Sequence, residues 1–420
     1  MSGHDLPHIV SPIPGPRSEA LIDRLARNEC PAITARRARR AAALGASSSD
    51  PIVWSEALGA NVWDADGNRY VDLTSGFGVA LVGHRDPEVV AAVHRQSGRL
   101  LHAMGDAFPD EARIALLDRL TALAPPSITH AILGLSGADA VDGAVKTALL
   151  ATGRTGVLGF AGGYHGLSLG TVPLQGYKAA FSEPFAAITH PDVRHLPYGC
   201  PLGDVRAALA GGDIGLVLVE PVQGRGGMRP APDGWLAGLA VLAHEAGALI
   251  AHDEIQCGLG RTGTLWAGTT EGPGPDLLCV GKALGGGLPL SATLGTEAVM
   301  SAWGASRGEA LHTQTFLGHP LGCAAALAVL DRMDVVPARC GERGHFLREA
   351  LESRGFRLRG RGLMLGVELE DSLRVTRDLL ERGFLVLPAG MQAEVLAVTP
   401  PMVLSDAQIT AFVDALAEVA

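Results

Sequence analysis

Short runs of apolar residues alternate with stretches of helical length from about residue 85 onward. Each run is apolar at consecutive positions, which is typical of strands that are buried on both faces. The runs cover residues 131–135, 156–160, 214–220, 247–254 and 276–281. Because helix-length segments separate them, the pattern predicts an α/β fold, with a large domain whose mostly parallel central sheet is covered by helices.

The two ends of the chain follow a different pattern. Residues 59–75 are expected to form a hairpin, because strand-like runs flank Asp66-Gly67, a pair favoured in tight turns. Beyond residue 320 we expect an alanine-rich helix, strands near 357–370 and 383–388, and a last helix at 405–419. These elements predict a smaller α+β domain that combines the N-terminal and C-terminal segments.

This organisation divides the chain into three stretches. Residues 1–60 are assigned to the small domain as its N-terminal segment, residues 61–315 to the large domain, and residues 316–420 to the small domain as its C-terminal part. The chain has 420 residues, of which 47% are hydrophobic and 19% charged. That composition is typical of a globular protein with enough apolar material for such cores.

Charge and cysteine content narrow the class of protein. The formal net charge is −10, and the basic cluster at residues 35–40 is interpreted as a solvated helix face, so nucleic acid is not expected as a partner. The six cysteines are scattered, without a C-x-x-C pair or zinc spacing, which predicts reduced thiols and no bound metal. With no signal-like start and no apolar run of about 18 residues, we expect a cytoplasmic protein without a membrane segment.

Ionisable residues stand at the ends of three predicted strands. Glu220 closes one apolar run, Asp253 the next, and Lys282 directly follows the third. In open parallel sheets, ligands bind outside the carboxyl ends of the strands, so the three side chains could share one site. The same spacing also fits helix caps or ion pairs at the sheet edge, and spacing alone does not decide between these interpretations.

Two loops add possible ligand contacts at the same edge. Ser136-Gly137 forms a strand-to-helix turn, and free N–H groups at a helix start suit a phosphate. The glycine-rich loop at residues 162–166 carries Tyr164 and His165, and the tyrosine ring could stack on a flat ligand or simply pack. The predicted edge thus offers a phosphate-binding turn, an aromatic ring, a carboxylate and an amine. Pyridoxal phosphate could use all four, because it has a phosphate, a flat ring and an aldehyde that condenses with an amine.

These segments resemble the class III (subgroup II) aminotransferases, which are fold type I pyridoxal-phosphate enzymes. The resemblance runs over roughly residues 50–405 and rests on several motifs in the family's order. The motifs are the segment at residues 59–93, "LVEPVQGRGG" (218–227), "IAHDEIQCGLGRTG" (250–263), "DLLCVGKALGGGLPLSA" (276–292) and "HTQTFLGHPLGCAAALAVL" (312–330). Their agreement in order and spacing is far more specific than any one of them.

The resemblance implies catalytic roles for two residues. Lys282 matches the lysine that forms a Schiff base with the cofactor, and Asp253 matches the acid that pairs with its pyridine nitrogen. Ile255 matches the aliphatic residue on one ring face, and Gln256 the glutamine near the ring hydroxyl. The implied reaction is a transaminase reaction, which moves an amino group from an amino acid or ω-amine to a keto acid.

Further cofactor contacts follow from the same resemblance. Tyr164 matches the stacking aromatic, with His165 beside it, and Glu220 matches an acid in the cofactor's surroundings. Gly137 and Ala138, after Ser136, match the phosphate-binding turn; Ala138 stands where the family often has a hydroxyl residue, so its contact would come from the backbone.

One further match, at Thr315, implies how the subunits assemble. Thr315 matches a residue that reaches the phosphate of the neighbouring subunit, which implies a homodimer with composite active sites.

Two positions depart from the family pattern together. Arg225 stands where many members have a glutamate, and Ala397 stands where they have an arginine that binds the α-carboxylate of glutamate or 2-oxoglutarate. Arg225 could bind a substrate carboxylate from the other side of the site, because a guanidinium suits bidentate recognition. Alternatively, the preference for 2-oxoglutarate is lost, or Arg225 faces solvent or a neighbouring chain.

Other activities fit the same scaffold. An amino-acid racemase or epimerase needs no keto acceptor, which agrees with the altered arginine position, and a decarboxylase would use the same cofactor. A cofactor-binding protein without turnover is a third hypothesis, although Lys282 and Asp253 are both retained.

Overall fold

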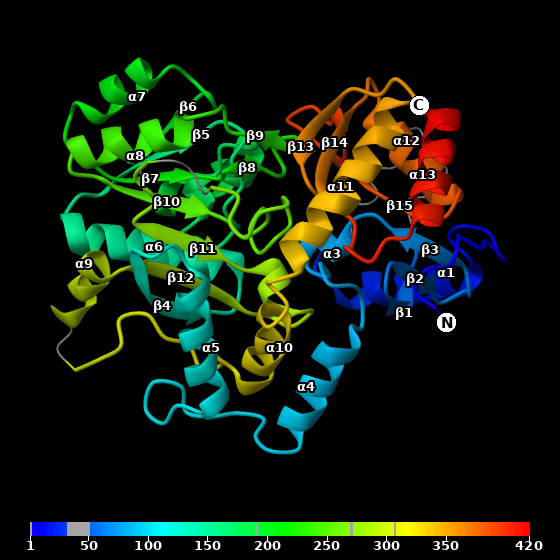
Figure 1. The fold of residues 1–420 in the computed structure, drawn as a ribbon, viewed down its shortest axis with the longest axis horizontal. Coiled ribbons are helices and arrows are strands. Elements are labelled where there is room, and N and C mark those ends of the chain that lie inside the picture. Colours follow the sequence, from blue (N-terminus) through cyan, green and yellow to red (C-terminus); the bar gives the residue numbers. More distant parts are fainter. Residues whose placement is uncertain (1, 32–50, 190–191, 269–271, 306–307) are drawn as a thin grey trace.

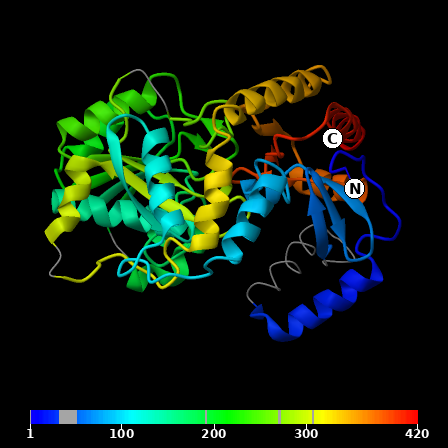
Figure 2. The ribbon, with the colours of Figure 1, turned by 60° about the horizontal axis from the view of Figure 1, so that its bottom comes forward.

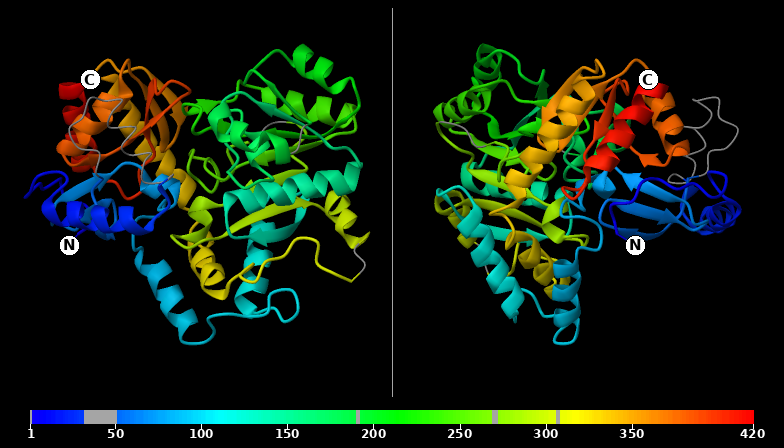
Figure 3. Two further views of the ribbon diagram at one scale, coloured as in Figure 1. Left: turned by 180° about the vertical axis from the view of Figure 1, so that it is seen from behind. Right: turned by 45° about the vertical axis from the view of Figure 1, so that its right-hand side comes forward.

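A computed structural model of the chain describes residues 2–31, 51–189, 192–268, 272–305 and 308–420 (Figure 1). The basic cluster at residues 35–40 lies outside these ranges. The protein has a large body on the left of Figure 1 and a smaller body on the right, and both termini lie on the smaller one in every view (Figures 2 and 3).

The large body is built on a seven-stranded sheet with the order β4-β12-β11-β10-β7-β5-β6. β12 is antiparallel to both of its neighbours, whereas β11, β10, β7, β5 and β6 pair in parallel. The strands are β4 (Ile128–Gly134), β5 (Gly156–Phe160), β6 (Val193–Leu196), β7 (Ile214–Val219), β10 (Leu249–Asp253), β11 (Leu277–Val280) and β12 (Ser291–Thr296). The predicted α/β fold with a mostly parallel sheet is confirmed.

Helices cover both faces of this sheet because its strands are apolar on both sides. In β7, Leu216 and Leu218 pack in the core beneath α6 (Gly137–Thr152), while Val217 and Val219 pack with α7 (Leu202–Leu209) and α8 (Trp235–Glu245). This alternation follows the two-residue repeat of a strand. The helices α4 (Pro87–Ser97), α5 (Glu111–Leu123) and α10 (Pro320–Leu330) pack together against the β11–β12 region.

The smaller body joins the two ends of the chain. The predicted hairpin is confirmed, because β2 (Asn61–Asp64) and β3 (Arg69–Asp72) are antiparallel, and β3 pairs in parallel with the C-terminal strand β15 (Phe384–Leu385). Its first sheet has the order β1-β2-β3-β15 and its second the order β13-β14-β17-β16. The predicted division at residue 61 falls at the start of β2 and the one at residue 316 lies before α10; both bounds stay predictions.

The remaining elements complete the two bodies. Strands and α-helices are α1 (Pro16–Asn28), β1 (Trp54–Leu58), α3 (Ser75–Gly78, an irregular turn), β8 (Val222–Gln223), β9 (Arg229–Pro230), α9 (Glu297–Met300), α11 (Val336–Glu352), β13 (Leu358–Arg361), β14 (Met364–Glu368), α12 (Ser372–Glu381), β16 (Leu387–Ala389), β17 (Val395–Val398) and α13 (Asp406–Val419). Short 3-10 helices are η1 (Val172–Leu174), η2 (Ala179–Phe181), η3 (Glu183–Ile188), η4 (Lys282–Gly285) and η5 (Ser301–Ala305). Among the described residues, none of the helices has both the length and the apolar character needed to cross a bilayer.

Candidate active site

The three ionisable strand ends lie side by side. β7, β10 and β11 are neighbours in the sheet, so Glu220, Asp253 and Lys282 emerge at one edge. Burial lowers the pKa of the Lys282 amine, and the nearby carboxylates of Asp253 and Glu220 oppose that shift only in part. The Lys282 Nζ donates to Gln256 Oε1 at 3.3 Å. The fold therefore gathers one amine and two carboxylates from positions about 30 residues apart, as parallel strands of this type require.

The backbone at Lys282 is unusual. Lys282 has a φ of +43°, in the left-handed region that residues other than glycine rarely occupy. Gly78 lies beside its side chain, and a Cβ at Gly78 would sit 3.5 Å from Lys282 Cδ. Directly after η4 (Lys282–Gly285) the loop also depends on glycine, because Gly286 has a φ of +58° and a Cβ there would lie only 3.0 Å from Val89.

Asp253 is fixed from two directions. Its Oδ2 lies 2.7 Å from Nδ1 of His165, and its Oδ1 accepts the N–H of Ile255 at 3.1 Å. Burial alone would lower the pKa of His165, but the bond and the charge of Asp253 outweigh burial and raise it. The pair is buried, with side-chain exposures of 2% for His165 and 4% for Asp253, so water does not screen it.

Glu220 connects two loops. Its Oε1 accepts the Tyr164 N–H at 2.8 Å, and its Oε2 accepts the Gly224 N–H at 3.0 Å. Burial raises the pKa of this carboxyl to about 7. Glu220 thus holds the loop that presents the Tyr164 ring and the loop that carries Arg225 in a fixed relation.

The start of α6 has the features of a phosphate site. Ser136 caps the helix by accepting the Asp139 N–H at 3.2 Å, while the N–H groups of Gly137 and Ala138 have no acceptor among the described residues. A Cβ at Gly137 would lie 3.1 Å from two carbon atoms of Ile255, so the glycine allows the helix start to approach that side chain. Together with a buried amine and a buried carboxylate, free amides at a helix N-terminus fit the phosphate, aldehyde and ring nitrogen of pyridoxal phosphate.

A cavity of about 760 Å³ opens in front of Lys282. Arg225 belongs to its wall, with its guanidinium carbon 4.6 Å from the centre of the Tyr164 ring and 5.9 Å from that of Tyr177. Its lining residues come from both bodies: Phe77, Tyr164, Tyr177, Lys178, Phe181, Gly224, Arg225, Met228, Gln256, Lys282, Leu373, Leu387, Pro388, Ala389, Gln392, Ala393, Ala397 and Thr399.

The fully buried Arg261 holds the smaller body on this cavity. Its guanidinium donates to the carbonyl oxygens of Leu363 and Pro400 and to Ser75 Oγ, and burial lowers its pKa to about 10. Pro400 follows the cavity residue Thr399. A single side chain of the large body therefore joins three segments next to the site, those of Ser75, Leu363 and Pro400.

The structure brings most of the sequence-predicted residues to one place. Lys282, Gln256, Tyr164, Arg225 and Ala397 line the cavity. The other predicted contacts stand behind it or beside it: Asp253, His165, Glu220, Ile255, Ser136, Gly137 and Ala138. Thr315 is exposed on this chain and is not part of the cavity wall, although its neighbour Gln314 donates to Asp139 at the start of α6.

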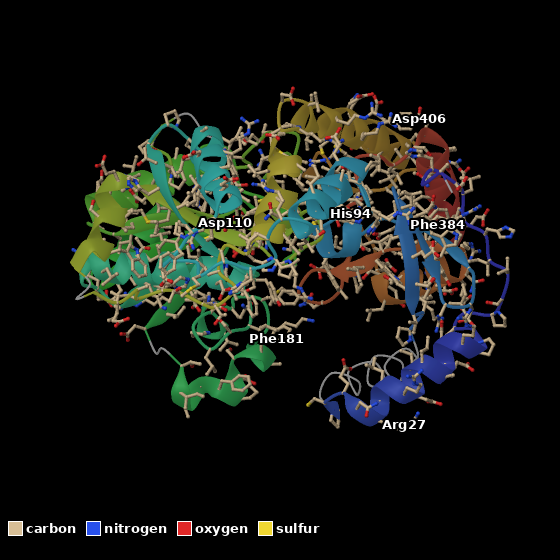
Figure 4. The ribbon with its side chains drawn as sticks, turned by 90° about the horizontal axis from the view of Figure 1, so that it is seen from below. Arg27, His94, Asp110, Phe181, Phe384 and Asp406 are labelled. Atoms are coloured by element: carbon tan, nitrogen blue, oxygen red, sulfur yellow. The ribbon has the colours of Figure 1, made fainter. Side chains whose placement is uncertain are left out.

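Several cavity residues were not predicted from the sequence. They include Phe77, Tyr177, Lys178 and Phe181 (Phe181 is labelled in Figure 4). Most carry no pattern that marks them, because they lie in irregular turns, short 3-10 helices or the loops beside them. Lys178 does carry one signal, since it is one of only three lysines in the chain.

Comparison with known proteins agrees with this geometry. The model of the family "Aminotransferase class-III" matches residues 44–420. The acetylornithine aminotransferase of Methanothermobacter thermautotrophicus is 36% identical over 88% of this chain and 94% of its own length. The putrescine aminotransferase of Pectobacterium atrosepticum is 34% identical over 82% of this chain and 77% of its own.

A solved structure supports the same assignment. The amine transaminase from an uncultivated Pseudomonas species, in its pyridoxal-phosphate-bound form, superposes with a TM-score of 0.81, with 27% identity, over 90% of this chain and 96% of that one. These similar proteins are all transaminases, and nothing among them favours a racemase or a decarboxylase. The chain belongs to the class-III aminotransferase family and is a pyridoxal-phosphate-dependent transaminase.

Proposed function

We propose that Lys282 binds the cofactor covalently and then carries the proton during transfer of an amino group from an amino acid or ω-amine to a keto acid. When bound, pyridoxal phosphate supplies an aldehyde that takes up the amino group and a ring that withdraws electrons from the reacting carbon. Burial lowers the pKa of Lys282, which favours the neutral amine that can act as nucleophile and base. Its place in the cavity, with Asp253 and Glu220 close behind, is the observation that carries the proposal.

Asp253 is proposed to keep the ring nitrogen protonated. A carboxylate does this best when it stays ionised and immobile, and both conditions are supported by its bonds to His165 and to the Ile255 N–H. Because the pKa of His165 is raised, a positive charge next to Asp253 favours the carboxylate form. His165 is thus a positioning residue, which acts on the cofactor through Asp253.

The remaining cofactor contacts have distinct roles in the proposal. Ser136, Gly137 and Ala138 hold the phosphate at the start of α6, mainly through backbone N–H groups. Tyr164 and Ile255 flank the ring. Gln256, which accepts a hydrogen bond from Lys282, is proposed to contact the ring hydroxyl.

Arg225 is proposed to bind a carboxylate of the substrate. Its guanidinium lies on the Tyr164 ring in the cavity wall and makes no ion pair among the described residues. A stacked arginine keeps its N–H groups in one plane, which suits bidentate binding of a carboxylate. Ala397 lines the same cavity and leaves that side without a guanidinium, so Arg225 takes over the role of the absent arginine.

We further propose that the enzyme is a cytoplasmic homodimer with composite active sites. All six cysteines are free, as expected for a reducing compartment. Exposed apolar side chains gather on two segments that touch through the His102 and Phe316 rings, 5.4 Å apart. Exposed on these segments are Leu100, Leu101, Met104, Phe108, Leu311 and Phe316, and such surface commonly marks an interface. The exposed Thr315 lies in the second segment, where it could reach a partner's phosphate.

The absorption spectrum of the holoenzyme tests the central role. An amino donor added without any keto acid should convert the band near ~420 nm into one near ~330 nm, as is typical of this cofactor. Lys282→Ala should lack the first band, whereas the control Lys146→Ala, on the outer part of α6, should keep both band and conversion. A ~420 nm imine band retained in Lys282→Ala would refute the assignment. Loss of optical purity of the donor without band conversion would instead show racemisation.

A further inference from the structure

Lysine is rare in this chain, and its positions are informative. Only three lysines, at positions 146, 178 and 282, occur among the 34 basic residues; all the others are arginines. Two of the three, Lys178 and Lys282, line the same cavity. Since arginine supplies almost all of the positive charge, a lysine at position 178 is not explained by the general composition of the chain.

Lys178 lies at the exposed part of the cavity wall. Its Nζ is 5.1 Å from the centre of the Tyr177 ring, a distance at which an ammonium group is attracted by the ring. The ring is itself held, because the Tyr177 hydroxyl donates to the Gly390 carbonyl oxygen at 3.1 Å and the ring stacks on Phe181. Figure 4 labels Phe181 in this segment.

Lys178 shares this ring with the proposed carboxylate-binding residue. The Arg225 guanidinium lies 5.9 Å from the Tyr177 ring centre and 4.6 Å from that of Tyr164. Arg225 is half-buried and close enough to Lys282 for its charge to lower the pKa of that amine, whereas Lys178 is exposed. The two cations therefore stand at different depths, with Arg225 nearer to the reacting amine.

The charged side chains on the cavity wall are all basic. Apart from Lys282, which the proposal assigns to the cofactor, its described lining residues include the cations Lys178 and Arg225 and no aspartate or glutamate. The rest of the wall is mainly aromatic and aliphatic. A low-dielectric wall strengthens the field of such charges, which attracts anions and repels a second ammonium group.

We propose that Lys178 binds the distal carboxylate of a dicarboxylic amino acid or keto acid whose first carboxylate is held by Arg225. This inference rests on the proposed function and adds the substrate class to it. A diamine is rejected, because its distal ammonium group would face Lys178 without a carboxylate to pair with. An amino acid with an apolar side chain can enter, but it forgoes the ion pair with Lys178.

Three five-carbon probes separate these cases by their affinity for the holoenzyme. Glutarate, pentanoate and 1,5-diaminopentane share one chain length but carry two, one and no carboxylates, and neither acid can be transaminated. Isothermal titration of the holoenzyme should show glutarate binding about fivefold more tightly than pentanoate, as expected for one exposed ion pair. The diamine should show no competition with glutarate. Equal affinity for glutarate and pentanoate, or tight binding of the diamine, would overturn the proposal.

Variants locate the effect on one side chain. Lys178→Met should reduce the affinity for glutarate to that for pentanoate and leave pentanoate unchanged, while Lys178→Arg should restore most of the difference. Lys146→Met, which removes a lysine outside the cavity, should behave as wild type. A preference for glutarate that survives Lys178→Met would show that another group provides it.

The spectrum distinguishes this failure from failure of the proposed function. If L-glutamate and L-alanine both convert the visible band and Lys178→Met alters neither, only the assignment of the distal carboxylate fails. If no amino donor converts the band of wild-type holoenzyme, the proposed transamination through Lys282 fails as well.

Discussion

The site has two regions whose polar side chains are held in different ways. At the sheet edge, Asp253, His165 and Glu220 are buried: Asp253 and His165 pair at 2.7 Å, and Glu220 accepts two backbone N–H groups at 2.8 and 3.0 Å. At the mouth of the cavity, Arg225 and Lys178 lie on aromatic rings and make no ion pair among the described residues. The first region cannot change without leaving a buried group unpaired, whereas the second can change at little cost.

This difference separates chemistry from substrate choice. The buried region keeps the geometry that every reaction of the cofactor requires. The exposed region can exchange one charged residue for another, and Arg225 and Ala397 show such an exchange relative to the family pattern. Substitutions in the buried region should therefore reduce turnover strongly for all substrates, while those at the mouth should alter affinity for particular substrates.

The largest effect is expected at the buried pair. Asp253→Asn removes the negative charge that faces His165 and the proposed ring nitrogen, so the rate of the half-reaction should fall by about 10³-fold or more. The measurement is single-turnover conversion of the visible band with saturating donor. If the half-reaction rate fell no more in Asp253→Asn than in a variant of Arg225 or Lys178, the two regions would not differ in function.

Arg225→Met should give the next largest effect, and of a different kind. Loss of one partly buried guanidinium should weaken the apparent affinity for L-alanine by about 30-fold, corresponding to roughly 2 kcal/mol, with little change in the saturated rate. Titration of the half-reaction rate against donor concentration separates these quantities. An unchanged affinity would show that Arg225 does not bind the substrate carboxylate.

The pH dependence of stability tests the buried region at Glu254, the buried residue that follows Asp253. Burial raises its folded-state pKa to about 6, although its carboxylate accepts the N–H groups of Ala267 and Gly268. Because the folded-state pKa exceeds the ordinary value of 4.5, its contribution to stability is complete below about pH 4.5 and is lost as the pH rises through 6.

The difference between the folded-state pKa of Glu254 and its ordinary value corresponds to about 2 kcal/mol of unfolding free energy. Chemical denaturation of wild type and Glu254→Gln at pH 4.5 and pH 8 should show the wild type losing about this much more than the variant. An equal pH dependence in both proteins would contradict the raised pKa.

The smallest effect is expected at the ring between the two cations. Tyr177→Phe keeps the ring and removes only the bond to Gly390, so glutarate affinity should change by less than about threefold. Tyr177→Leu removes the ring that contacts both Lys178 and Arg225. This variant should weaken the binding of glutarate more than the binding of pentanoate. If both variants behave alike, stacking does not hold the cations.

The buried region is the part of the site that the sequence predicts best. Glu220, Asp253 and Lys282 end or follow apolar runs, and strands that are apolar on both faces lie next to one another in parallel sheets. Their convergence follows from strand order alone. His165 is harder to predict, because its contact with Asp253 depends on the path of an irregular loop, which no periodic pattern in the sequence indicates.

The mouth of the cavity is the part that the sequence does not predict. Lys178 and Tyr177 lie in an irregular segment before η2, where no periodicity indicates the direction of a side chain. Thr399 and Ala397 come from the smaller body and reach the cavity through the β3–β15 pairing and the contacts of Arg261.

The sequence by itself determined the α/β fold, the hairpin and the strand-end positions of the ionisable groups, because these depend on local apolar patterns with short repeats. Only the tertiary structure decided that Arg225 stacks on Tyr164 and shares Tyr177 with Lys178. Those contacts join loops whose paths are set by packing between the two bodies. The local pattern of apolar and polar residues does not indicate packing between segments so far apart in the sequence.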